Sequence, residues 1–448
     1  MRFPLIELLI TLLLVAPLST AKKCEISPLG EGLDDTEQKL SMEVERAIEE
    51  CGRHGWTVLN PGTYNITRKM TWDLHSSKVD LYGYLSFQPD IEYWLDAEST
   101  YRVIFIQSQA SWFVVTGSDF TIDAHNEGGI QGNGQPWWEY FTTHTRDDGD
   151  GRPLSLTLYR AFHSVVKNFR IESPPFWCNA VAESSGVRYE GMLCNATNVN
   201  PEFAGQNIVP NTDGIDTYRS DSVTLLDWDV TCGDDCLAIK GNSTNVLARN
   251  ITCRGGNGIA FGSLGQYYNL SDLVINVHLE DLQMLRLDAK VQPNMANGVY
   301  FKSWTGTVNG SPPTGGGGGK GFVSNIVAKN VFLDRVNRPL HLYQTNNGHS
   351  GDLPSQLTFA NLQFLNWSGT AVTNEIVDIE CSTGCDGVFF NDFDVEGPGN
   401  EAPEYICRNV TGVEGLTGTV LVFLRLPLLN ASFQHLATRL EYEQMMQS

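Results

Sequence analysis

Carboxylate and amide side chains recur at a fixed spacing near the middle of the chain. Asp213, Asp235 and Asn257 lie 22 residues apart, and Asp234 directly precedes Asp235. Hydrolysis of a glycosidic bond needs one carboxylic acid that protonates the leaving oxygen, and a second carboxylate that attacks the sugar or activates water. Crowded carboxylates do not all ionise easily, so at least one of them gains a raised pKa and can serve as the acid. These residues are therefore candidates for glycosidic hydrolysis.

The spacing is informative only if the fold stacks one repeat on the next. The apolar residues Ile215, Leu237 and Ile259 share the 22-residue interval, and Val299 follows Ile259 after 40 residues. Between about residues 54 and 410, short β-rich runs alternate with Gly, Asn, Asp and Ser, and no long helix interrupts them. A sandwich or a barrel is the ordinary explanation of many short strands. The repeat favours a different all-β fold, a right-handed parallel β-helix or solenoid.

Stacked coils would make Asp213 and Asp235 close neighbours, because adjacent strands lie about 4.8 Å apart. A simpler explanation is that each aspartate belongs to a turn, since Asp-Gly and Gly-Asp pairs are common there. The shared register and the adjacent glycines, which let a ligand approach the backbone, favour a catalytic role instead. Two alternatives stay open: a Ca²⁺-dependent lyase, because clustered carboxylates bind Ca²⁺, and a carbohydrate-binding β-helix without catalysis.

The longer intervals between later coils predict inserted loops. Residues 139–151 and Gly315–Gly319 are polar or glycine-rich stretches of this kind. Long loops on one side of a solenoid usually wall a binding groove. At the bends between strands, we expect Asn, Ser and Thr side chains to hydrogen-bond along the stack.

The two ends of the chain differ from the central repeats. Residues 24–60 contain the strongest helix pattern, which we expect to cap the first coil, fastened by Cys24 and Cys51. Apolar residues near the C-terminus are too few to span a bilayer. We predict a secretory signal peptide over residues 1–21, a single catalytic β-helix over residues 22–410, and a C-terminal tail of undefined structure over residues 411–448.

Composition limits the partners and the compartment. The chain carries 30 basic and 52 acidic residues and a formal net charge of −22. Nucleic acid is therefore not an expected partner, because phosphate binding needs a basic surface. We expect a secreted, extracellular monomer without a membrane partner, whose ten cysteines form disulfides rather than a metal site, and no cofactor. Candidate N-glycosylation sequons begin at Asn65, Asn195, Asn242, Asn250, Asn269, Asn366, Asn409 and Asn430.

Five motifs stand out along the chain: Gly132–Trp138, Ser173–Trp177, Asn211–Asp213, Gly233–Cys236 and Gly258–Gly265. Together they make the chain resemble glycoside hydrolase family 28, the polygalacturonases and rhamnogalacturonan hydrolases. The resemblance extends over about residues 45–400 and implies a right-handed parallel β-helix. It also implies inverting, metal-free hydrolysis of a pectic polysaccharide or oligosaccharide by single displacement.

The resemblance also implies roles for individual residues. Asp234 stands at the position of the family's general acid. Asp213 and Asp235 stand at the positions that hold the attacking water. Cys236 and Cys253 match a disulfide of the family just after the acid pair.

Two positions depart from the pattern of the common family members. Enzymes that cut homogalacturonan usually carry histidine in a Gly-His-Gly turn, where this chain has Asn257, and its loss is a feature of rhamnogalacturonan-directed members. The family's Arg-x-Lys, which holds a substrate carboxylate, is Tyr300-Phe301-Lys302 here, so the lysine remains and the arginine is gone. We expect Lys302 to bind substrate by charge, and Tyr300 and Tyr267 by stacking on sugar faces.

Inserts in the later coils bear on the mode of attack. Those over residues 265–297 and 305–321 predict a cleft that is blocked at one end, and Gly262–Tyr267 is similar to a segment of exo-acting fungal members. The leading prediction is an exo-acting inverting hydrolase that releases galacturonate or rhamnose from pectin, from rhamnogalacturonan-type chains. An exo-polygalacturonase on homogalacturonan and an α-L-rhamnosidase are the alternatives within the family, and a Ca²⁺-dependent pectate lyase lies outside it.

Overall fold

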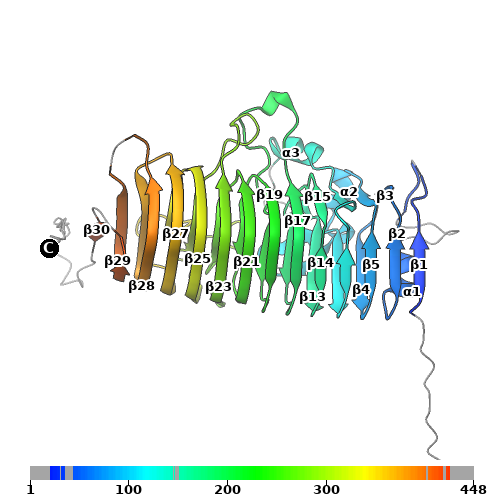
Figure 1. Cartoon of the computed structure of the whole chain (residues 1–448), viewed down its shortest axis with the longest axis horizontal. Helices are drawn as coiled ribbons and strands as arrows, with labels where there is room; N and C mark the ends of the chain where they lie inside the picture. The colour runs from blue at the N-terminus through cyan, green and yellow to red at the C-terminus, as the bar shows by residue number, and fades with distance from the viewer. Residues whose placement is uncertain are drawn as a thin grey trace, which may run out of the picture.

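The chain forms the right-handed parallel β-helix that the repeat predicts (Figure 1). The computed structural model describes residues 21–30, 32–35, 44–144, 146, 151–399, 402–416 and 420–423. Among these residues, 27 strands make one sheet system in which neighbouring coils pair in parallel. Successive coils lie side by side along the long axis, from β1 (Lys23–Ile26) at one end to β29 (Glu404–Glu414) and β30 (Val420–Phe423) at the other (Figure 1).

One ladder of paired strands carries the candidate catalytic residues, and we call it the site sheet. Each strand of this ladder pairs with the corresponding strand of the following coil, so every coil adds one strand to the site sheet. It ends with the first part of β28 (Glu375–Glu396), the first part of β29, and β30. Its earlier strands are β4 (Met70–His75), β9 (Phe113–Ser118), β13 (Leu156–Phe162), β16 (Asn179–Ala182), β18 (Ile215–Tyr218), β20 (Asp235–Ile239), β22 (Gly258–Leu264), β24 (Asn297–Trp304) and β26 (Arg338–Asn346).

The remaining sides of the solenoid consist of short strands in the early coils and long, bent strands in the later coils. The short strands are β2 (Trp56–Leu59), β3 (Thr63–Ile66), β5 (Lys78–Leu81), β6 (Tyr84–Phe87), β10 (Thr121–Asp123), β11 (Gly129–Gln131), β14 (Val165–Lys167) and β15 (Arg170–Glu172). The long strands are β17 (Arg188–Asn195), β19 (Thr224–Thr231), β21 (Ser243–Arg254), β23 (Ser271–Leu285), β25 (Lys320–Val336) and β27 (Gln356–Ala371).

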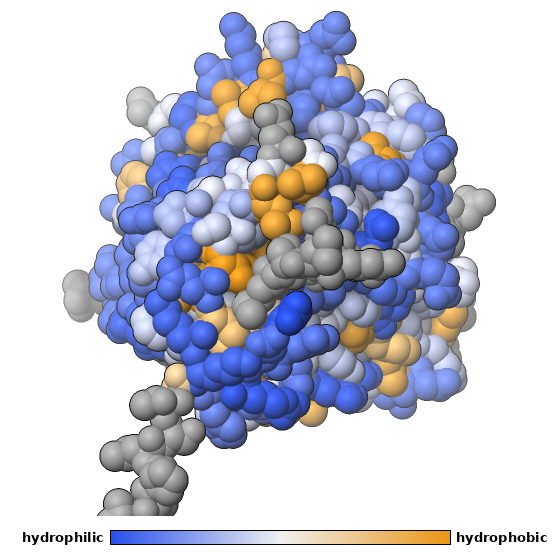
Figure 2. Space-filling view, turned by 90° about the vertical axis from the view of Figure 1, so that its right-hand side faces the viewer, coloured by the Kyte–Doolittle hydropathy of each residue, from blue (hydrophilic) through white to orange (hydrophobic). Residues whose placement is uncertain are grey.

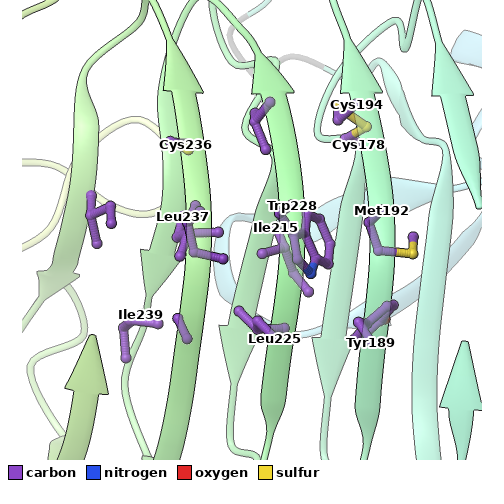
Figure 3. Packing of buried hydrophobic residues seen from close by; sticks show 14 of the residues in the cluster. Cys178, Tyr189, Met192, Cys194, Ile215, Leu225, Trp228, Cys236, Leu237 and Ile239 are labelled. Carbon is purple, nitrogen blue, oxygen red and sulfur yellow. A yellow bond between two sulfur atoms is a disulfide. The ribbon is translucent and has the colours of Figure 1, made fainter. Parts of the chain in front are cut away.

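The predicted apolar row fills the interior of the solenoid. Ile215, Leu237, Ile259, Val299 and Leu340 pair in that order along the site sheet, and all are fully buried. Figure 3 shows two of them, Ile215 and Leu237, within the buried core. Burial stabilises the fold by roughly 1.5–3 kcal/mol for each such side chain. The longer intervals after Ile259 are therefore additions outside the core, as the sequence predicts.

Polar side chains form ladders at the bends of the long strands, which confirms the expected stacking. Asn366 donates Nδ2 to Oδ1 of Asn330 at 2.8 Å, Asn330 donates to Asp281 at 2.8 Å, and Asn250 donates to Asp227 at 2.6 Å. All five have φ between 54° and 58°. Asn and Asp adopt this left-handed conformation at lower cost than most other residues. A second row of the same kind joins Asn245, Asn276, Asn325 and Asn361.

A helix is present where the capping helix is predicted, and its described part begins at Val44. α1 (Val44–Cys51) buries Val44, Ala47, Ile48 and Cys51, and the Cys24–Cys51 disulfide fastens it to β1. Sequence analysis found no other good helix, but the loops contain α2 (Ile91–Leu95) and α3 (Gln135–Phe141) and three single 3₁₀ turns. These helices are too short for a periodic pattern to reveal them. The 3₁₀ turns are η1 (Ala97–Ser99), η2 (Ile106–Ser108) and η3 (Pro201–Phe203).

Eight of the ten cysteines form disulfides. The Cys236–Cys253 pair implied by the family resemblance is present, and so are Cys24–Cys51, Cys178–Cys194 (seen in Figure 3) and Cys381–Cys385. The expectation that all ten pair is wrong, because Cys232 and Cys407 are buried as free thiols. They lie on different coils, so neither reaches the other.

The chain ends are only partly covered by the described residues. Residues 1–20 of the predicted signal peptide and the Asn430 sequon lie outside them. The strand ladder continues past the predicted boundary at residue 410, since β29 pairs with β30. Seen end-on from the side of β1, the surface is mainly hydrophilic, with apolar residues gathered near its middle (Figure 2).

None of the helices in the described part of the chain has the length and apolar character needed to cross a membrane.

The ladder makes a testable contribution to stability. Asn330→Ala is expected to lower the free energy of unfolding by about 2–5 kcal/mol. Alanine removes two ladder hydrogen bonds, each worth ~0.5–1.5 kcal/mol, and is strained by ~1–2 kcal/mol in the left-handed conformation. Asn330→Gly keeps that conformation accessible and should lose less. Unfolding midpoints in guanidinium chloride measure the difference.

Gln363→Ala, at an exposed strand position, is the matched control and should change stability by no more than about 0.5 kcal/mol. Equal losses for the alanine and glycine variants of Asn330 would contradict the assigned cost of the left-handed backbone.

Candidate active site

The site sheet has a low floor at its centre. Ala238 and Ala260 are neighbours in register on β20 and β22, and both face outward. Asp216 continues this row on one side, and Tyr300 and then His341 continue it on the other. Because the two alanines are small, long side chains from β24 can lie across the floor toward β20.

The three candidate aspartates meet at the edge of this floor. One carboxylate oxygen from each of Asp213, Asp234 and Asp235 lies within 4.8 Å of the others. The backbone N–H of Gly214 donates to the carbonyl of Asp235 at 3.0 Å, which fixes one coil against the next. Asp213 and Asp235 are almost fully buried, at 3% and 1% exposure, whereas Asp234 is partly exposed. The predicted stacking of Asp213 and Asp235 is therefore present.

Asn257 lies one position away from its expected register. The strands pair Gly258 with Asp235, because the register shifts between Asp235 and Leu237. Asn257 meets Asp234 instead: its Nδ2 donates to Oδ1 at 2.8 Å, and its backbone N–H donates to the carbonyl of Asp234 at 2.6 Å. The 22-residue register holds for the apolar row but not for this residue.

Asn211 holds the other oxygen of Asp234. Its backbone N–H and its Nδ2 both donate to Oδ2, at 3.1 and 3.2 Å. Arg152 in turn donates to Oδ1 of Asn211 at 3.3 Å, and its guanidinium is buried near the rings of Phe141 and Phe176. Sequence analysis missed Arg152, because nothing in its local sequence sets it apart from any loop arginine.

Asp235 is held by two residues from β24. The hydroxyl of Tyr300 donates to Oδ1, and Nζ of Lys302 donates to Oδ2 at 3.0 Å. Lys302 also donates to the hydroxyl of Tyr300 at 3.1 Å. Both residues were predicted as substrate contacts. The structure places them at the site, with their polar ends on a candidate catalytic carboxylate.

The environment raises the pKa of Asp213 and that of Asp234. Burial, followed by the charges of the neighbouring aspartates, raises the pKa of Asp213 well above its usual range. Burial and then the charge of Asp235 raise the pKa of Asp234, while the nearby charge of Lys302 and hydrogen bonds from Asn211 and Asn257 act in the opposite direction. The cluster therefore combines two carboxyls whose protonated form is favoured with Asp235, which is paired with Lys302 at 3.0 Å.

A second buried ion pair lies beside the aspartates. Nζ of Lys240 is 2.9 Å from Oδ1 of Asp216, and both side chains are almost inaccessible. The lysine also lies 4.8 Å from the centre of the Trp177 ring. Burial, opposed by the charge of Lys240, raises the pKa of Asp216 to about 7. The sequence does not single out this pair, although Asp216 directly follows the predicted interior residue Ile215 and should therefore point outward.

The outward face of the site sheet is covered on the side of the earlier coils. Ala182 of β16 and Tyr218 of β18 are buried in an apolar cluster with Trp177, Ile104 and Leu154. Ile104 and Leu154 belong to a separate small sheet of three strands, β7 (Tyr101–Ile104), β8 (Gln109–Ser111) and β12 (Pro153–Leu154). No groove can continue over β16 and β18 while this small sheet covers them.

Tyr267 helps to close the same side. Its hydroxyl accepts a hydrogen bond from the backbone N–H of Gln107 at 2.7 Å, and its ring lies 5.1 Å from that of Phe105. This contact joins segments 160 residues apart in sequence. Tyr267, predicted as a substrate contact, thus belongs to the wall of the groove and does not line the open pocket.

The outward face remains open on the side of the later coils. A pocket of about 720 Å³ lies over β24 and β26, within the volume range of about 300–1,000 Å³ that is usual for small-molecule sites. Three predicted site residues line it: Asn257, Tyr300 and Lys302. Three residues outside the predicted site also line it: Arg338, His341 and Tyr343. The site therefore has one closed side and one open side.

The insert predicted over residues 265–297 is only partly a loop. Residues 271–285 form β23, an ordinary strand of the solenoid, and the additional residues lie on both sides of it. In the segment after β23, Gln292 donates to Asn207 at 3.1 Å, and the carbonyl of Lys290 accepts from Gly205 at 3.3 Å. In the segment before it, Gln266 donates to the carbonyl of Gly315 at 3.0 Å. Both segments build walls along the edges of the site sheet.

Comparison with known proteins identifies the family of this chain. The model of the family "Glycosyl hydrolases family 28" matches residues 71–418. The chain is 37% identical over 420 residues to "Putative galacturan 1,4-alpha-galacturonidase A" of Aspergillus niger, covering 88% of this chain and 92% of that protein. It is 31% identical over 412 residues to "Alpha-L-rhamnosidase rgxB" of the same species, covering 89% and 90%.

A solved structure shares the fold. The endo-xylogalacturonan hydrolase of Aspergillus tubingensis superposes with a TM-score of 0.69 at 21% identity, covering 88% of this chain and 98% of that one. The family model matches most of the chain, and three aspartates meet at one edge of the site sheet. The chain belongs to glycosyl hydrolases family 28 and is a glycoside hydrolase of pectin.

Proposed function

We propose that this protein is a secreted, exo-acting hydrolase that removes one terminal sugar at a time from pectin, from chains of the rhamnogalacturonan type. The observation that carries the proposal is the groove at the three aspartates, closed over β16 and β18 and open over β24 and β26. A closed side leaves room for the end of a chain but not for its interior. Four disulfides among the described residues agree with an oxidising compartment.

The names of the relatives support galacturonate or rhamnose as the released sugar. Two of them are called galacturan 1,4-alpha-galacturonidase and alpha-L-rhamnosidase, and a third, 29% identical over 428 residues, is the exopolygalacturonase of Cochliobolus carbonum. The exo-polygalacturonase on homogalacturonan is therefore the second candidate. Asn257 at the position of the usual histidine is the feature that favours a rhamnogalacturonan-type chain.

In the proposed mechanism, Asp234 protonates the leaving oxygen. It is the most exposed of the three aspartates, and its raised pKa keeps the proton available. Asp235 accepts the proton of the attacking water, because Lys302 stabilises its negative charge. Asp213 orients the same water. Its buried carboxyl has an Oδ1 without a hydrogen-bond partner among the described residues, which a water molecule can satisfy.

The contacts of Asp235 favour water over a covalent intermediate. Tyr300 and Lys302 engage both of its oxygens, so Asp235 is poorly placed to attack a sugar carbon. The distance between the carboxylates, by contrast, favours a covalent intermediate. Oxygens within 4.8 Å are closer than the roughly 6.5–9.5 Å typical of inverting pairs. We give more weight to the blocked oxygens, because the spacing rule describes a pair that flanks the sugar from opposite faces.

The same contacts argue against a calcium site at the three aspartates. Carboxylates within 4.8 Å of one another could bind Ca²⁺. Here the ammonium of Lys302 already lies 3.0 Å from Oδ2 of Asp235. A second cation in this place would be repelled by the first.

Product analysis tests the proposed function. With trigalacturonate, a rhamnose–galacturonate oligomer ending in rhamnose, and an aryl rhamnoside, we expect a monosaccharide as the first product. Proton NMR should show that the anomeric configuration of this product is inverted. A chelator should leave the rate unchanged, since no step requires a metal ion.

Three results would overturn parts of this proposal. Rapid thinning of a pectic polymer before reducing sugar accumulates would exclude exo action. A first product with retained configuration would exclude single displacement. Loss of activity with a chelator, together with unsaturated uronide products, would favour the lyase.

Asp234→Asn is expected to lower kcat by about 10²–10⁴-fold, because the amide cannot protonate the leaving oxygen. An aryl glycoside should lose less, since its leaving group needs less protonation. Asp119→Asn, at an exposed surface position, is the control and should keep the full rate. Unchanged turnover in Asp234→Asn, with the fold intact, would assign the acid to another residue or support a non-catalytic protein.

The pH profile tests the environment of Asp234. Activity requires the protonated acid, so kcat/KM should fall as the pH rises through the raised pKa of Asp234. Asn257 donates to this carboxyl and stabilises its charged form. Asn257→Ala should therefore raise the pKa further and move the alkaline limb of the profile to higher pH. A limb that stays in place or moves to lower pH would show that another group controls it.

A further inference from the structure

The open pocket contains a cation that the proposed mechanism does not use. Arg338 begins β26 and lines the pocket together with Lys302 and His341. In the strand register, Tyr300 of β24 is followed by His341 of β26 and then by Asp378 of β28. The pocket floor thus runs from the residues that hold Asp235 to a second group of charged side chains on the later coils.

Three neighbours hold one side of the Arg338 guanidinium. Nε is 3.1 Å from Oε1 of Glu375, and Nη1 is 3.6 Å from Oδ2 of Asp378. Nη1 also lies 3.1 Å from Nε2 of His341. Because the arginine nitrogen is the donor, Nε2 of His341 is the acceptor, and the ring proton belongs on Nδ1.

The other side of the guanidinium is available. Nη2 of Arg338 makes no hydrogen bond with any residue that the structure describes. The side chain remains 44% exposed. A guanidinium that is fixed at Nε and Nη1 keeps a pair of N–H groups in a set direction, which is the arrangement that suits a carboxylate.

His341 cannot provide the charge itself. Burial and then the charge of Arg338 lower the pKa of His341 to about 4, so the ring is neutral in mildly acidic solution. Its ring stacks on Tyr343, with 4.8 Å between the centres. His341 therefore offers a neutral N–H donor on a rigid support, beside the positive charge of Arg338.

In mild acid, Arg338 has one negatively charged neighbour fewer than at higher pH. Burial and then the charges of Glu375 and Glu380 raise the pKa of Asp378 to about 6. Below that pH the protonated form of Asp378 dominates, and its carboxyl no longer places a negative charge beside Arg338. The Oδ1 of Asp378 is buried without a hydrogen-bond partner among the described residues, which agrees with a carboxyl that is neutral much of the time.

We propose that Arg338, positioned by Glu375, Asp378 and His341, binds the carboxylate of a uronate on the leaving side of the cleaved bond. The proposal rests on the proposed function, because it takes the open pocket as the place of the departing chain. It adds a requirement that the aspartates do not impose: the sugar next to the released one is a galacturonate with a free carboxylate. On an alternating rhamnose–galacturonate chain the released sugar would then be rhamnose, and on homogalacturonan it would be galacturonate.

The experiment compares a charged substrate with its neutral counterpart. Trigalacturonate and the rhamnose–galacturonate oligomer both place a galacturonate next to the terminal sugar, and methyl esterification removes its charge. We expect kcat/KM for the free acid to fall at least about 10-fold in Arg338→Gln, mostly through KM, as a lost charge-assisted hydrogen bond implies. The methyl ester should react equally fast with wild type and variant. Arg338→Lys should recover part of the loss.

Arg335→Gln is the matched control, since Arg335 is an exposed arginine paired with Asp334 away from the pocket. It should leave both rates unchanged. An equal loss on acid and ester in Arg338→Gln would mean that Arg338 only holds β26 against β28, and would overturn the proposal. No loss on either substrate would overturn it as well.

Failure of the proposed function is recognised separately. If neither oligomer is hydrolysed, binding to the Asp234→Asn protein still tests Arg338. Calorimetry should then show at least about 10-fold weaker binding of the methyl ester than of the free trigalacturonate, and Arg338→Gln should abolish this difference. Equal binding of ester and acid by the protein with Arg338 intact would refute the role of Arg338.

Discussion

The close stacking of parallel coils is the constraint on which the rest of this structure depends. Neighbouring strands in a solenoid lie about 4.8 Å apart, so any residue type that recurs with the coil is forced against its own kind. For Ile215, Leu237 and Ile259 this produces a continuous buried row. For Asp213 and Asp235 the same stacking brings two carboxylates so close together that they repel each other when both are ionised.

Residues on the neighbouring coils offset this electrostatic repulsion. Lys302 and Tyr300 reach across the small side chains of Ala238 and Ala260 to hold Asp235. The amide groups of Asn211 and Asn257 hold Asp234 from two sides. Burial and the charges of the neighbouring aspartates raise the pKa of Asp213 instead. One repeated geometry thus places three carboxyl groups in different surroundings, as acid and base catalysis requires.

Prediction from the sequence succeeded where one residue type repeats at a fixed interval and burial in the core fixes its position. The interval of the apolar row was enough to predict the parallel β-helix and the meeting of Asp213 with Asp235. It was not enough for Asn257, because a shift of one residue in strand register leaves no mark in the local sequence. Arg152, Lys240 and Arg338 were also missed. Each acts through a partner far away in the chain or on another coil, and a single charged residue in a loop or on a strand has no pattern of its own.

The contact between Gln107 and Tyr267 has a consequence for the order of folding. Most pairings in a solenoid join one coil to the next, and such neighbouring contacts form at low entropic cost. This contact bridges 160 residues and can form only after the intervening coils have stacked. The wall of the groove should therefore assemble late and open early, while the coils beneath remain intact. Closure of the groove is a local equilibrium, separate from the stability of the solenoid that supports it.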